Sequence, residues 1–341
     1  MSFSIYLLSM TDFNSLIILL IAAVADYLIG DPQNWLHPVQ VMGWVITYYT
    51  QIFFKYFNQP RILRVAGVFL TLIVVWGSAL TVALIRDGIQ GLVMRFSGPE
   101  ILSLAVESIL LASCFAGRSL RDSAEDVLYW IDQGDLVTAR QRLSRYVGRD
   151  TETLSESEIL RAVLETVTEN ATDGVMAPLF YALIGAVLPG VGSVPLTFAY
   201  KAASTLDSMV GYREAPYGDI GWFSAKLEDV LTWLPCRLTV ITIAILSGKP
   251  GYVLTICQRD AIFDPSPNAG WSECAYAAAL GVQLGGENSY RGVIKHKPFL
   301  GDPQQPITST TIKKALQLTR YSFLITLGLF TGGFILFNWA N

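Results

Sequence analysis

The chain has 341 residues, of which 52% are hydrophobic and only 15% are charged. Soluble domains carry about 25% charged residues, and the mean hydropathy here is +0.43, so the composition excludes an ordinary soluble protein. A net charge of −4 provides no basic surface for nucleic acid. The four cysteines stand apart and there are only two histidines. This argues against a disulfide framework or a zinc site and excludes a histidine-rich metal centre.

Apolar stretches that could cross a bilayer, which needs roughly 20 such residues, recur along the chain. In chain order the candidates are residues 13–29, 62–85, 101–117, 175–199, 230–247 and 320–340. The pattern predicts an all-α, polytopic integral membrane protein with about 4–6 membrane segments, some of them re-entrant, and two helical polar cytoplasmic regions. Pro189 and Gly190 interrupt the fourth candidate and predict a broken or re-entrant segment.

The polar and apolar stretches predict five parts. These are residues 1–117 with membrane segments and a turn-rich site loop at 26–43, a helical cytoplasmic domain at 118–174, broken membrane segments at 175–247, a second polar region at 248–319 and a last span at 320–341. Ser155 and Glu158 form a capping box that predicts a helix running to Asn170. The aromatic, amphipathic stretch 45–57 predicts an interfacial helix.

The distribution of Lys and Arg predicts the orientation. Most of these residues flank the polar regions, whereas the opposite side carries chiefly Arg86 and Arg95. The positive-inside rule therefore predicts a multi-pass protein of the cell (inner) membrane, with the polar regions and the active site facing the cytoplasm. For the charges at 201–229 to lie on that side as well, residues 175–199 and 230–247 must both be re-entrant.

Three groups of ionisable residues flank the central apolar segments, and charge beside a membrane segment usually has a function. Helical spacing puts Glu165 and Glu169 on one face. The same spacing joins Tyr200 to Asp207, and Lys226 to Asp229. The polar sequence Asn170-Ala-Thr-Asp173-Gly174 predicts a turn whose side-chain oxygens suit a cation. Acidic and basic groups together at a membrane surface indicate a site for phosphates and a divalent cation.

Each of these signals has a simpler interpretation. Glu165 and Glu169 could form a solvated helix face, Lys201 could anchor the helix in lipid head groups, and Lys226 with Asp229 could be a surface ion pair. His37 precedes a proline and could be a turn residue. Neither a P-loop nor a dinucleotide fingerprint occurs, so any nucleotide must be held by scattered carboxylates and cations.

The order of the motifs is more specific than any one of them. The motifs are Asp-x4-Asp-Pro…His-Pro-Val (26–39), Glu-Asn-x-x-Asp-Gly-x-x-Ala-Pro-Leu-Phe-Tyr (169–181), Tyr-Lys-Ala-x-x-Thr-Leu-Asp-Ser-Met-Val-Gly-Tyr (200–212), Pro-Cys-Arg-Leu-Thr (235–239), Ser-Pro-Asn-Ala-Gly (266–270) and Leu-Gly-Gly (284–286). Together they resemble the cobinamide-phosphate synthase family of cobalamin biosynthesis (CobD/CbiB type), from about Asp26 to Tyr290. One departure is Lys226-Leu-Glu228-Asp229 in place of Arg-Leu-Asp-Asp, which keeps the charge but loses the arginine fork.

The resemblance implies a membrane-embedded amide synthase that joins adenosylcobyric acid to an aminopropanol phosphate with consumption of ATP. Such a reaction needs Mg²⁺ on carboxylates and cations on phosphate oxygens. We expect catalytic roles for His37, Glu165, Lys201, Asp207 and Lys226, and metal ligands among Glu169, Asp173, Asp207 and Asp229. The expected substrate-binding residues are Asp26, Asp31, Asn170, Tyr200, Tyr212, Arg213, Arg237, Ser266, Asn268, Gly285 and Gly286.

Two other classes of function are compatible with the chain. Glu107 within an apolar segment and the break at Pro189-Gly190 are features of transporters, so a membrane corrinoid carrier is one alternative. A non-catalytic scaffold for other cobalamin-pathway proteins, or a homo-oligomer with that role, is the second. The lipid bilayer is an expected partner in every case, and ATP hydrolysis that depends on both co-substrates distinguishes the synthase from the alternatives.

Overall fold

A computed structural model describes residues 2–31, 36–96 and 99–340. Residues 32–35 of the predicted site loop at 26–43 lie outside the described residues. The chain divides into two compact units, each built from separate stretches of sequence. The first comprises Met1–Ala116, Ala177–Leu231 and Leu327–Asn341, and the second comprises Gly117–Met176 and Thr232–Thr326.

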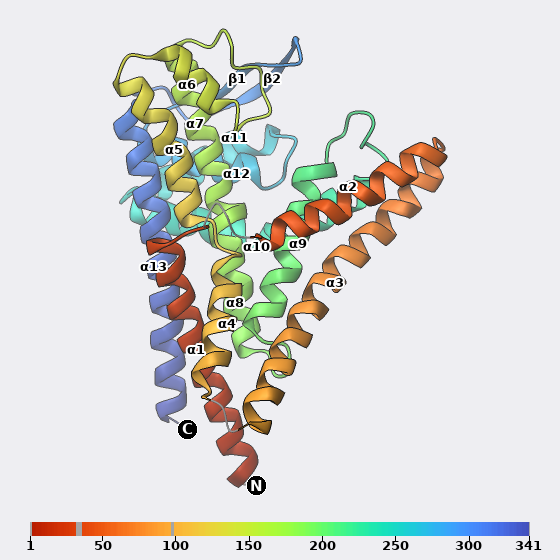
Figure 1. Ribbon diagram of the computed structural model, residues 1–341. Coiled ribbons are helices and arrows are strands. Elements are labelled where there is room, and N and C mark those ends of the chain that lie inside the picture. The colour runs from red at the N-terminus through yellow and green to blue at the C-terminus, as the bar shows by residue number, and fades with distance from the viewer. Residues whose placement is uncertain (1, 32–35, 97–98, 341) are drawn as a thin grey trace. The chain divides into compact units, whose positions relative to one another are not determined.

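The first unit consists of apolar helices (Figure 1). They are α1 (Ser2–Leu28), α2 (Pro38–Tyr56), α3 (Pro60–Arg95), α4 (Ile101–Ala112), α8 (Ala177–Val187), α9 (Ser193–Val210), the start of α10 (Trp222–Leu246) and the end of α13 (Ser309–Ala340). Helix α3 is longer than the predicted span at 62–85 because no helix breaker occurs before Gly98-Pro99. Helix α9 packs against both α3 and α8.

Among the described residues, three helices are long and apolar enough to cross a membrane, namely α3, α10 and Ser309–Phe337 within α13. A fourth crossing results if α4 and the following α5 (Gly117–Asp132) are one broken span. Residues 13–28 of α1 form a shorter apolar helix. The prediction of a helical, polytopic membrane protein is therefore confirmed, with these candidates near the lower end of the predicted number of segments.

The predicted break at Pro189-Gly190 is confirmed, because α8 ends at Val187 and α9 starts at Ser193. The two helices form a tight hairpin: a Cβ on Gly185 would lie only 2.8 Å from the Cα of Ser193. Further along, the rings of Tyr181 and Tyr200 stack with centroids 4.8 Å apart. The middle of α8 therefore packs against the middle of α9, and the two helices run antiparallel.

The second segment predicted to be re-entrant, residues 230–247, is part of the continuous helix α10, so the break expected there is absent. Pro235 is accommodated inside this helix. Because Pro235 has no N–H, the carbonyl of Leu231 lacks its donor within the helix, and the hydroxyl of Tyr181 donates to this carbonyl instead at 2.8 Å.

The second unit combines helices with one β-hairpin. It contains α5, α6 (Leu136–Leu143), α7 (Glu156–Asn170), a π-helix (Ala171–Met176), the end of α10, α11 (Pro250–Asp260), α12 (Ala269–Leu280), β1 (Leu284–Tyr290), β2 (Val293–Leu300) and the start of α13. Strands β1 and β2 are antiparallel. The second polar region is thus only partly helical, in contrast to the prediction.

Helix α7 starts as predicted, since Ser155 and Glu158 form both halves of a capping box. Ile159, Val163 and Leu164 are buried in a core shared with α5, α10, α11, α12 and α13.

The four cysteines are buried and form no disulfide, as expected for packing residues.

The predicted turn at 170–174 is wrong, because a π-helix occupies this position. The hydroxyl of Ser272 on α12 donates to the carbonyl of Thr168 at 2.5 Å and lies 2.8 Å from the hydroxyl of Thr172. A side chain inserted into the helical ladder widens it locally. A partner distant in the sequence therefore decides the conformation of this segment.

Candidate active site

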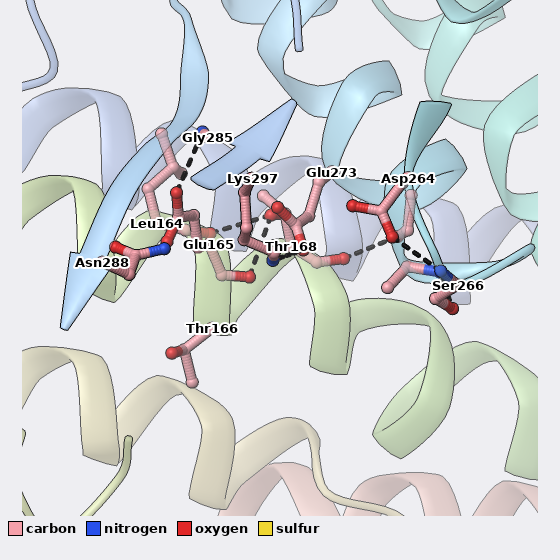
Figure 2. Close-up of polar contacts among 12 residues, drawn as sticks. Leu164, Glu165, Thr166, Thr168, Asp264, Ser266, Glu273, Gly285, Asn288 and Lys297 are labelled. Atoms are coloured by element: carbon pink, nitrogen blue, oxygen red, sulfur yellow. Dashed lines mark hydrogen bonds and ion pairs between the residues drawn. The ribbon is translucent and has the colours of Figure 1, made fainter. Parts of the chain in front are cut away.

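Glu165 joins helix α7 to the β-hairpin in the second unit (Figure 2). Only 1% of Glu165 is exposed, so the interpretation as a solvated face is wrong for this residue. One carboxylate oxygen accepts the backbone N–H of Gly285 at 3.0 Å, and the other forms an ion pair with Arg149. Gly285 has φ +87°, and a Cβ there would collide with the carbonyl oxygen of Pro298. The Leu-Gly-Gly motif therefore permits a backbone approach that no other residue allows.

Two arginines bind the β-hairpin at or near the same glycines. Arg149 donates to the side-chain oxygen of Asn288 at 2.8 Å, and Arg161 donates to the carbonyl oxygen of Gly285. A Cβ on Gly286 would lie 3.2 Å from a guanidinium nitrogen of Arg161. The amide nitrogen of Asn288 is buried and has no hydrogen-bond partner among the described residues. Sequence reasoning found Glu165 and both glycines but missed the arginines and Asn288.

Lys297 lies among buried carboxylates (Figure 2). Its ammonium is 3.1 Å from Glu273, which is fully buried. Burial raises the pKa of Glu273 to about 8, although the positive charge of Lys297 opposes the increase. Burial raises the pKa of Glu169 as well. For Lys297, burial lowers the pKa, but the surrounding carboxylates outweigh this effect, so the pKa is raised and the ammonium stays charged.

This group of carboxylates has more acceptors than donors. One oxygen of Glu273 and one of Asp264 are buried and have no hydrogen-bond partner among the residues that the structure describes. Buried polar atoms almost always have a partner, so these two indicate a missing proton or cation. The sequence did carry a signal for Glu273, because a lone carboxylate in the apolar run 269–280 is the pattern that drew attention to Glu107.

Arg237 on α10 holds the Ser-Pro-Asn-Ala-Gly loop. It donates to the carbonyl of Pro267 at 2.8 Å and to the side chain of Asn268 at 3.0 Å. Its guanidinium lies 5.0 Å from the ring centroid of Trp233 and 4.7 Å from that of Trp271. An arginine between two tryptophans is held by cation–π attraction as well as by hydrogen bonds. The predicted residues Arg237 and Asn268 are thus in direct contact.

The loop itself is a turn, as its sequence indicates. The hydroxyl of Ser266 accepts the N–H of Ala269 at 3.0 Å, and Asp264 accepts the N–H of Ser266 at 2.8 Å. Asp173 is close enough to act electrostatically on Cys236, the neighbour of Arg237. Of the remaining predicted residues in this unit, Asn170 is exposed and bonds its own helix through the carbonyl of Thr166.

His37 and Asp31 meet in the first unit. The Nε2 atom of His37 lies 3.1 Å from Asp31, while its Nδ1 accepts the N–H of Val39 at the start of α2. The hydrogen bond from the N–H of Val39 requires an Nδ1 without a hydrogen. The neutral imidazole therefore carries its hydrogen on Nε2, which donates a hydrogen bond to Asp31. Both nitrogens are therefore engaged, and His37 orients Asp31 while capping the helix.

Lys201 is half-buried on α9, one residue after the fully buried Tyr200. No ion pair of Lys201 occurs among the described residues. Its charge and that of Asp31 both act on the buried thiol of Cys114, so Lys201 and Asp31 belong to one neighbourhood. Asp26, near the end of α1, is also buried in this unit.

The other predicted residues of the first unit lie nearer its surface. Lys226 and Asp229 form an ion pair of 2.9 Å in which 58% of the lysine side chain is exposed, which is the geometry of the simpler interpretation. Tyr212 and Arg213 are exposed. Asp207 is half-buried near the end of α9, where its carboxylate occupies the space that a Cβ on Gly211 would need.

The described residues contain no group of three or more His, Cys, Asp or Glu side chains that could hold a metal ion. Mg²⁺ at nucleotide sites usually takes only one or two carboxylates, together with phosphate oxygens and waters. Glu169 and Asp264 fit this requirement for one or two carboxylates. Both are half-buried, and one oxygen of Asp264 has no hydrogen-bond partner among the described residues. Glu169 and Asp173 of the predicted ligands lie in the second unit, whereas Asp207 and Asp229 lie in the first.

Comparison with known proteins identifies the family. The family described as CobD/Cbib protein matches residues 19–319. Cobalamin biosynthesis protein CobD of Synechocystis sp. is 52% identical over 89% of this chain and 87% of its own length. Cobalamin biosynthesis protein CbiB of Salmonella arizonae is 40% identical over 91% of this chain and 94% of its own.

Cobalamin biosynthesis protein CobD of Halalkalibacterium halodurans is also 40% identical, over 92% of this chain and 95% of its own. No solved structure matches the chain. The matched region covers the site loop, the charged residues of both units and the β-hairpin. The chain therefore belongs to the CobD/CbiB family of cobalamin biosynthesis proteins.

Proposed function

We propose that the protein is an adenosylcobinamide-phosphate synthase. It would form an amide bond between a propionate of adenosylcobyric acid and (R)-1-amino-2-propanol O-phosphate, with consumption of ATP. The observation that carries this proposal is that family motifs distant in the sequence are in contact. Arg237 of the motif at 235–239 binds Asn268 of the motif at 266–270, and Glu165, four residues before the motif at 169–181, binds the backbone of Gly285. The curated relatives are named as cobalamin biosynthesis proteins.

The chemistry requires activation of a carboxylate, because a carboxylate is a poor electrophile. A propionate oxygen attacks the γ-phosphorus of ATP, an acyl phosphate forms and ADP leaves. The amine nitrogen then attacks the acyl carbon, the C–N bond forms, phosphate leaves and the nitrogen loses a proton. Phosphoryl transfer depends mainly on positioning and on neutralising phosphate charge.

In the second unit, we propose that one or two of the carboxylates of Glu169, Asp173 and Asp264 contribute oxygens for Mg²⁺, which would neutralise phosphate oxygens when bound. Glu165 is fully engaged by Arg149 and by the N–H of Gly285. Its role in this proposal is therefore to position the Leu-Gly-Gly turn. Arg237, Ser266 and Asn268 would present the neighbouring loop to substrate.

In the first unit, we propose that Lys201 binds a phosphate group, since it is half-buried and forms no ion pair among the described residues. Asp31 would accept the proton from the amine because His37 donates to it and holds it in place. Asp207 remains a proposed metal ligand, as does Asp229. Lys226 and Arg213 would attract phosphates from the surface.

For the membrane setting, we propose an inner-membrane location with the second unit on the cytoplasmic side, because Lys and Arg flank the polar regions. A cysteine placed near Asp135 should resist a membrane-impermeant reagent applied to intact cells and should react after lysis. Labelling from outside would overturn this orientation.

The function is tested with the purified protein in detergent or lipid discs. We expect ATP hydrolysis only when the corrinoid carboxylate and the aminopropanol phosphate are both present, and an amide product of the corresponding mass. A carrier or scaffold would show neither. Hydrolysis that does not depend on both co-substrates, or the absence of product, would overturn the proposal.

Asp207→Asn should remove most turnover while the protein still inserts and folds, because an amide is a weaker ligand for Mg²⁺ than a carboxylate. Glu125→Gln on the exposed face of α5 is the matched control and should retain full turnover. If Asp207→Asn turns over normally at limiting Mg²⁺, Asp207 is not a ligand.

A further inference from the structure

The part of helix α10 in the second unit, from Thr232 onwards, is apolar on two opposite faces. One face is buried, since Cys236, Val240 and Ile243 lie in the core of the unit. The other face carries the α10 stripe, four large side chains that are between 44% and 64% exposed, namely Leu234, Leu238, Ile241 and Ile245. Intervals of four, three and four residues place them on one side of the helix. Such a contiguous exposed patch marks a surface that contacts lipid or another molecule.

Length and composition would allow α10 to cross a bilayer, but its middle carries charge. Arg237 lies three residues from the midpoint of Trp222–Leu246, and it donates to the side chain of Asn268 at 3.0 Å. Asn268 belongs to the loop at 264–270, which also contains Asp264. If α10 crossed the bilayer, it would hold this arginine and this loop near the centre of the hydrocarbon region. Charged side chains are costly and rare there.

Helix α11 turns back beside α10 and brings further charges to the same level. Cys257 on α11 and Cys236 on α10 lie in one core, and the two thiols interact electrostatically. Cys236 is ten residues before the end of α10, and Cys257 is seven residues after the start of α11, so the chain doubles back. Arg259, two residues further along, forms ion pairs with Asp260 and Asp302 and is 52% exposed. A crossing α10 would draw these three charged residues into lipid.

The second unit has its own entry into the membrane. Residues 309–326 of this unit form the first half of α13, which is a candidate span, and Tyr321 and Leu324 on it are exposed. Figure 1 shows α10 running across the direction of α13 rather than along it. When α13 crosses the bilayer, α10 therefore lies closer to the membrane plane. Trp233, beside the α10 stripe, is 51% exposed, and tryptophan is enriched where lipid meets water.

We propose that α10 lies along the interface between lipid and water and does not cross the bilayer. Its partner is the lipid surface: the α10 stripe packs against acyl chains, while the opposite face packs into the core of the second unit. Both ends of α10 are then on the same side of the membrane. The charged residues at 201–229 thus reach the side of the polar regions, as the sequence required, with a continuous helix in place of the expected break.

The first experiment determines which side of the membrane each end of α10 faces. The natural cysteines are buried, so Glu214→Cys before the helix and Lys249→Cys after it provide exposed thiols. With a membrane-impermeant reagent, we expect both to resist labelling in intact cells and to react after lysis. If only one of them is labelled from outside, α10 crosses the bilayer and the proposal is overturned. Labelling of both from outside supports the proposal but contradicts the cytoplasmic orientation of the proposed function.

The second experiment measures the depth of the α10 stripe in lipid discs. Nitroxide labels are attached one at a time to Leu234→Cys, Leu238→Cys, Ile241→Cys and Ile245→Cys, and their accessibility to oxygen and to a polar nickel chelate reports the depth. We expect all four labels at one shallow depth, roughly 5–10 Å into the lipid. A crossing helix would spread them over about 16 Å, the rise along the helix from the first position to the last.

Helix α3 supplies a matched control. Four of its side chains have the same intervals as the α10 stripe and are between 52% and 70% exposed, namely Phe69, Ile73, Trp76 and Leu80. Because α3 is a candidate span, labels there should spread over about 16 Å in depth. An equal spread on α10 would overturn the proposal.

A second copy of the chain is the other molecule that could cover the α10 stripe. In that case the labels on the stripe would be inaccessible to oxygen and would show spin–spin coupling between molecules, and the lipid proposal would be overturned. No outcome of either experiment depends on turnover, so failure here is distinct from failure of the proposed function.

Discussion

Two regions, one in each unit, leave buried polar groups unpaired, and the groups differ in kind. Around Lys297 in the second unit, oxygens of Glu273 and Asp264 are acceptors without donors among the described residues. At the start of α9 in the first unit, the buried hydroxyl of Ser193 has no hydrogen-bond partner among the described residues, and no side chain caps the helix. Since an unpaired buried polar group costs about 1–3 kcal/mol, each region points to what completes it. The region around Lys297 in the second unit calls for a proton or cation, and the start of α9 in the first for a hydrogen-bond partner to a hydroxyl.

The largest expected effect comes from removing the cation that the second unit does have. At pH 9, where Glu273 is ionised, Lys297→Met should lower the free energy of unfolding by roughly 3–5 kcal/mol, because a buried carboxylate loses its partner. Chemical denaturation in detergent, followed by tryptophan fluorescence, measures the change.

Lys295→Met on the same strand is the control, since Lys295 is exposed and its loss should change stability by less than about 0.5 kcal/mol. Replacing both Lys297 and Glu273 by Met should recover most of the loss. If Lys297→Met is no more harmful than Lys295→Met, the carboxylates of this region are not short of positive charge and the comparison between the units fails.

A second test concerns the pH dependence of stability. Burial raises the pKa of Glu273 from 4.5 to about 8, so the folded protein binds a proton that the unfolded chain has released. The stabilisation is fully present below pH 4.5 and is lost as the pH rises to about 8, with a slope of at most ~1.4 kcal/mol per pH unit.

Glu273→Gln should flatten this part of the profile, because an amide does not titrate. Unfolding free energies measured from pH 5 to pH 8.5 for both proteins provide the comparison. If the slope of unfolding free energy against pH is unchanged in Glu273→Gln, other groups cause the pH dependence. The unpaired oxygen of Glu273 would then not carry a proton that is released in this pH range.

The smallest expected effect lies at Lys201 in the first unit. Lys201→Arg should insert normally but lose at least ~10-fold in kcat/KM, about 1.4 kcal/mol of transition-state stabilisation. A planar guanidinium cannot replace a compact ammonium fitted to a phosphate. The coupled ATP assay measures the loss, and the membrane yield reports on insertion.

A lipid anchor would tolerate the same change, because either side chain can extend to the head groups. Near-normal kinetics in Lys201→Arg with normal yield would therefore favour the anchor. The phosphate ligand of the proposed function would then be sought at Arg213 or Lys226.

The sequence by itself determined the features that depend on local pattern. Composition predicted a helical membrane protein, the pair Ser155 and Glu158 predicted the start of α7, and Pro189-Gly190 predicted the break between α8 and α9. Capping, hydropathy and helix breaking act over a few neighbouring residues. The ordered motifs also indicated the family.

Only the tertiary structure decided which charges are buried and what they contact. The spacing of Glu165 and Glu169 suggested a shared face, but Glu165 is buried against Arg149, 16 residues before it, and Gly285, 120 residues after it. The π-helix at Ala171–Met176 depends in the same way on Ser272, about a hundred residues on. Lys297 and Glu273 escaped notice because each acquires its environment from another element, and periodicity within one helix or strand carries no information about such partners.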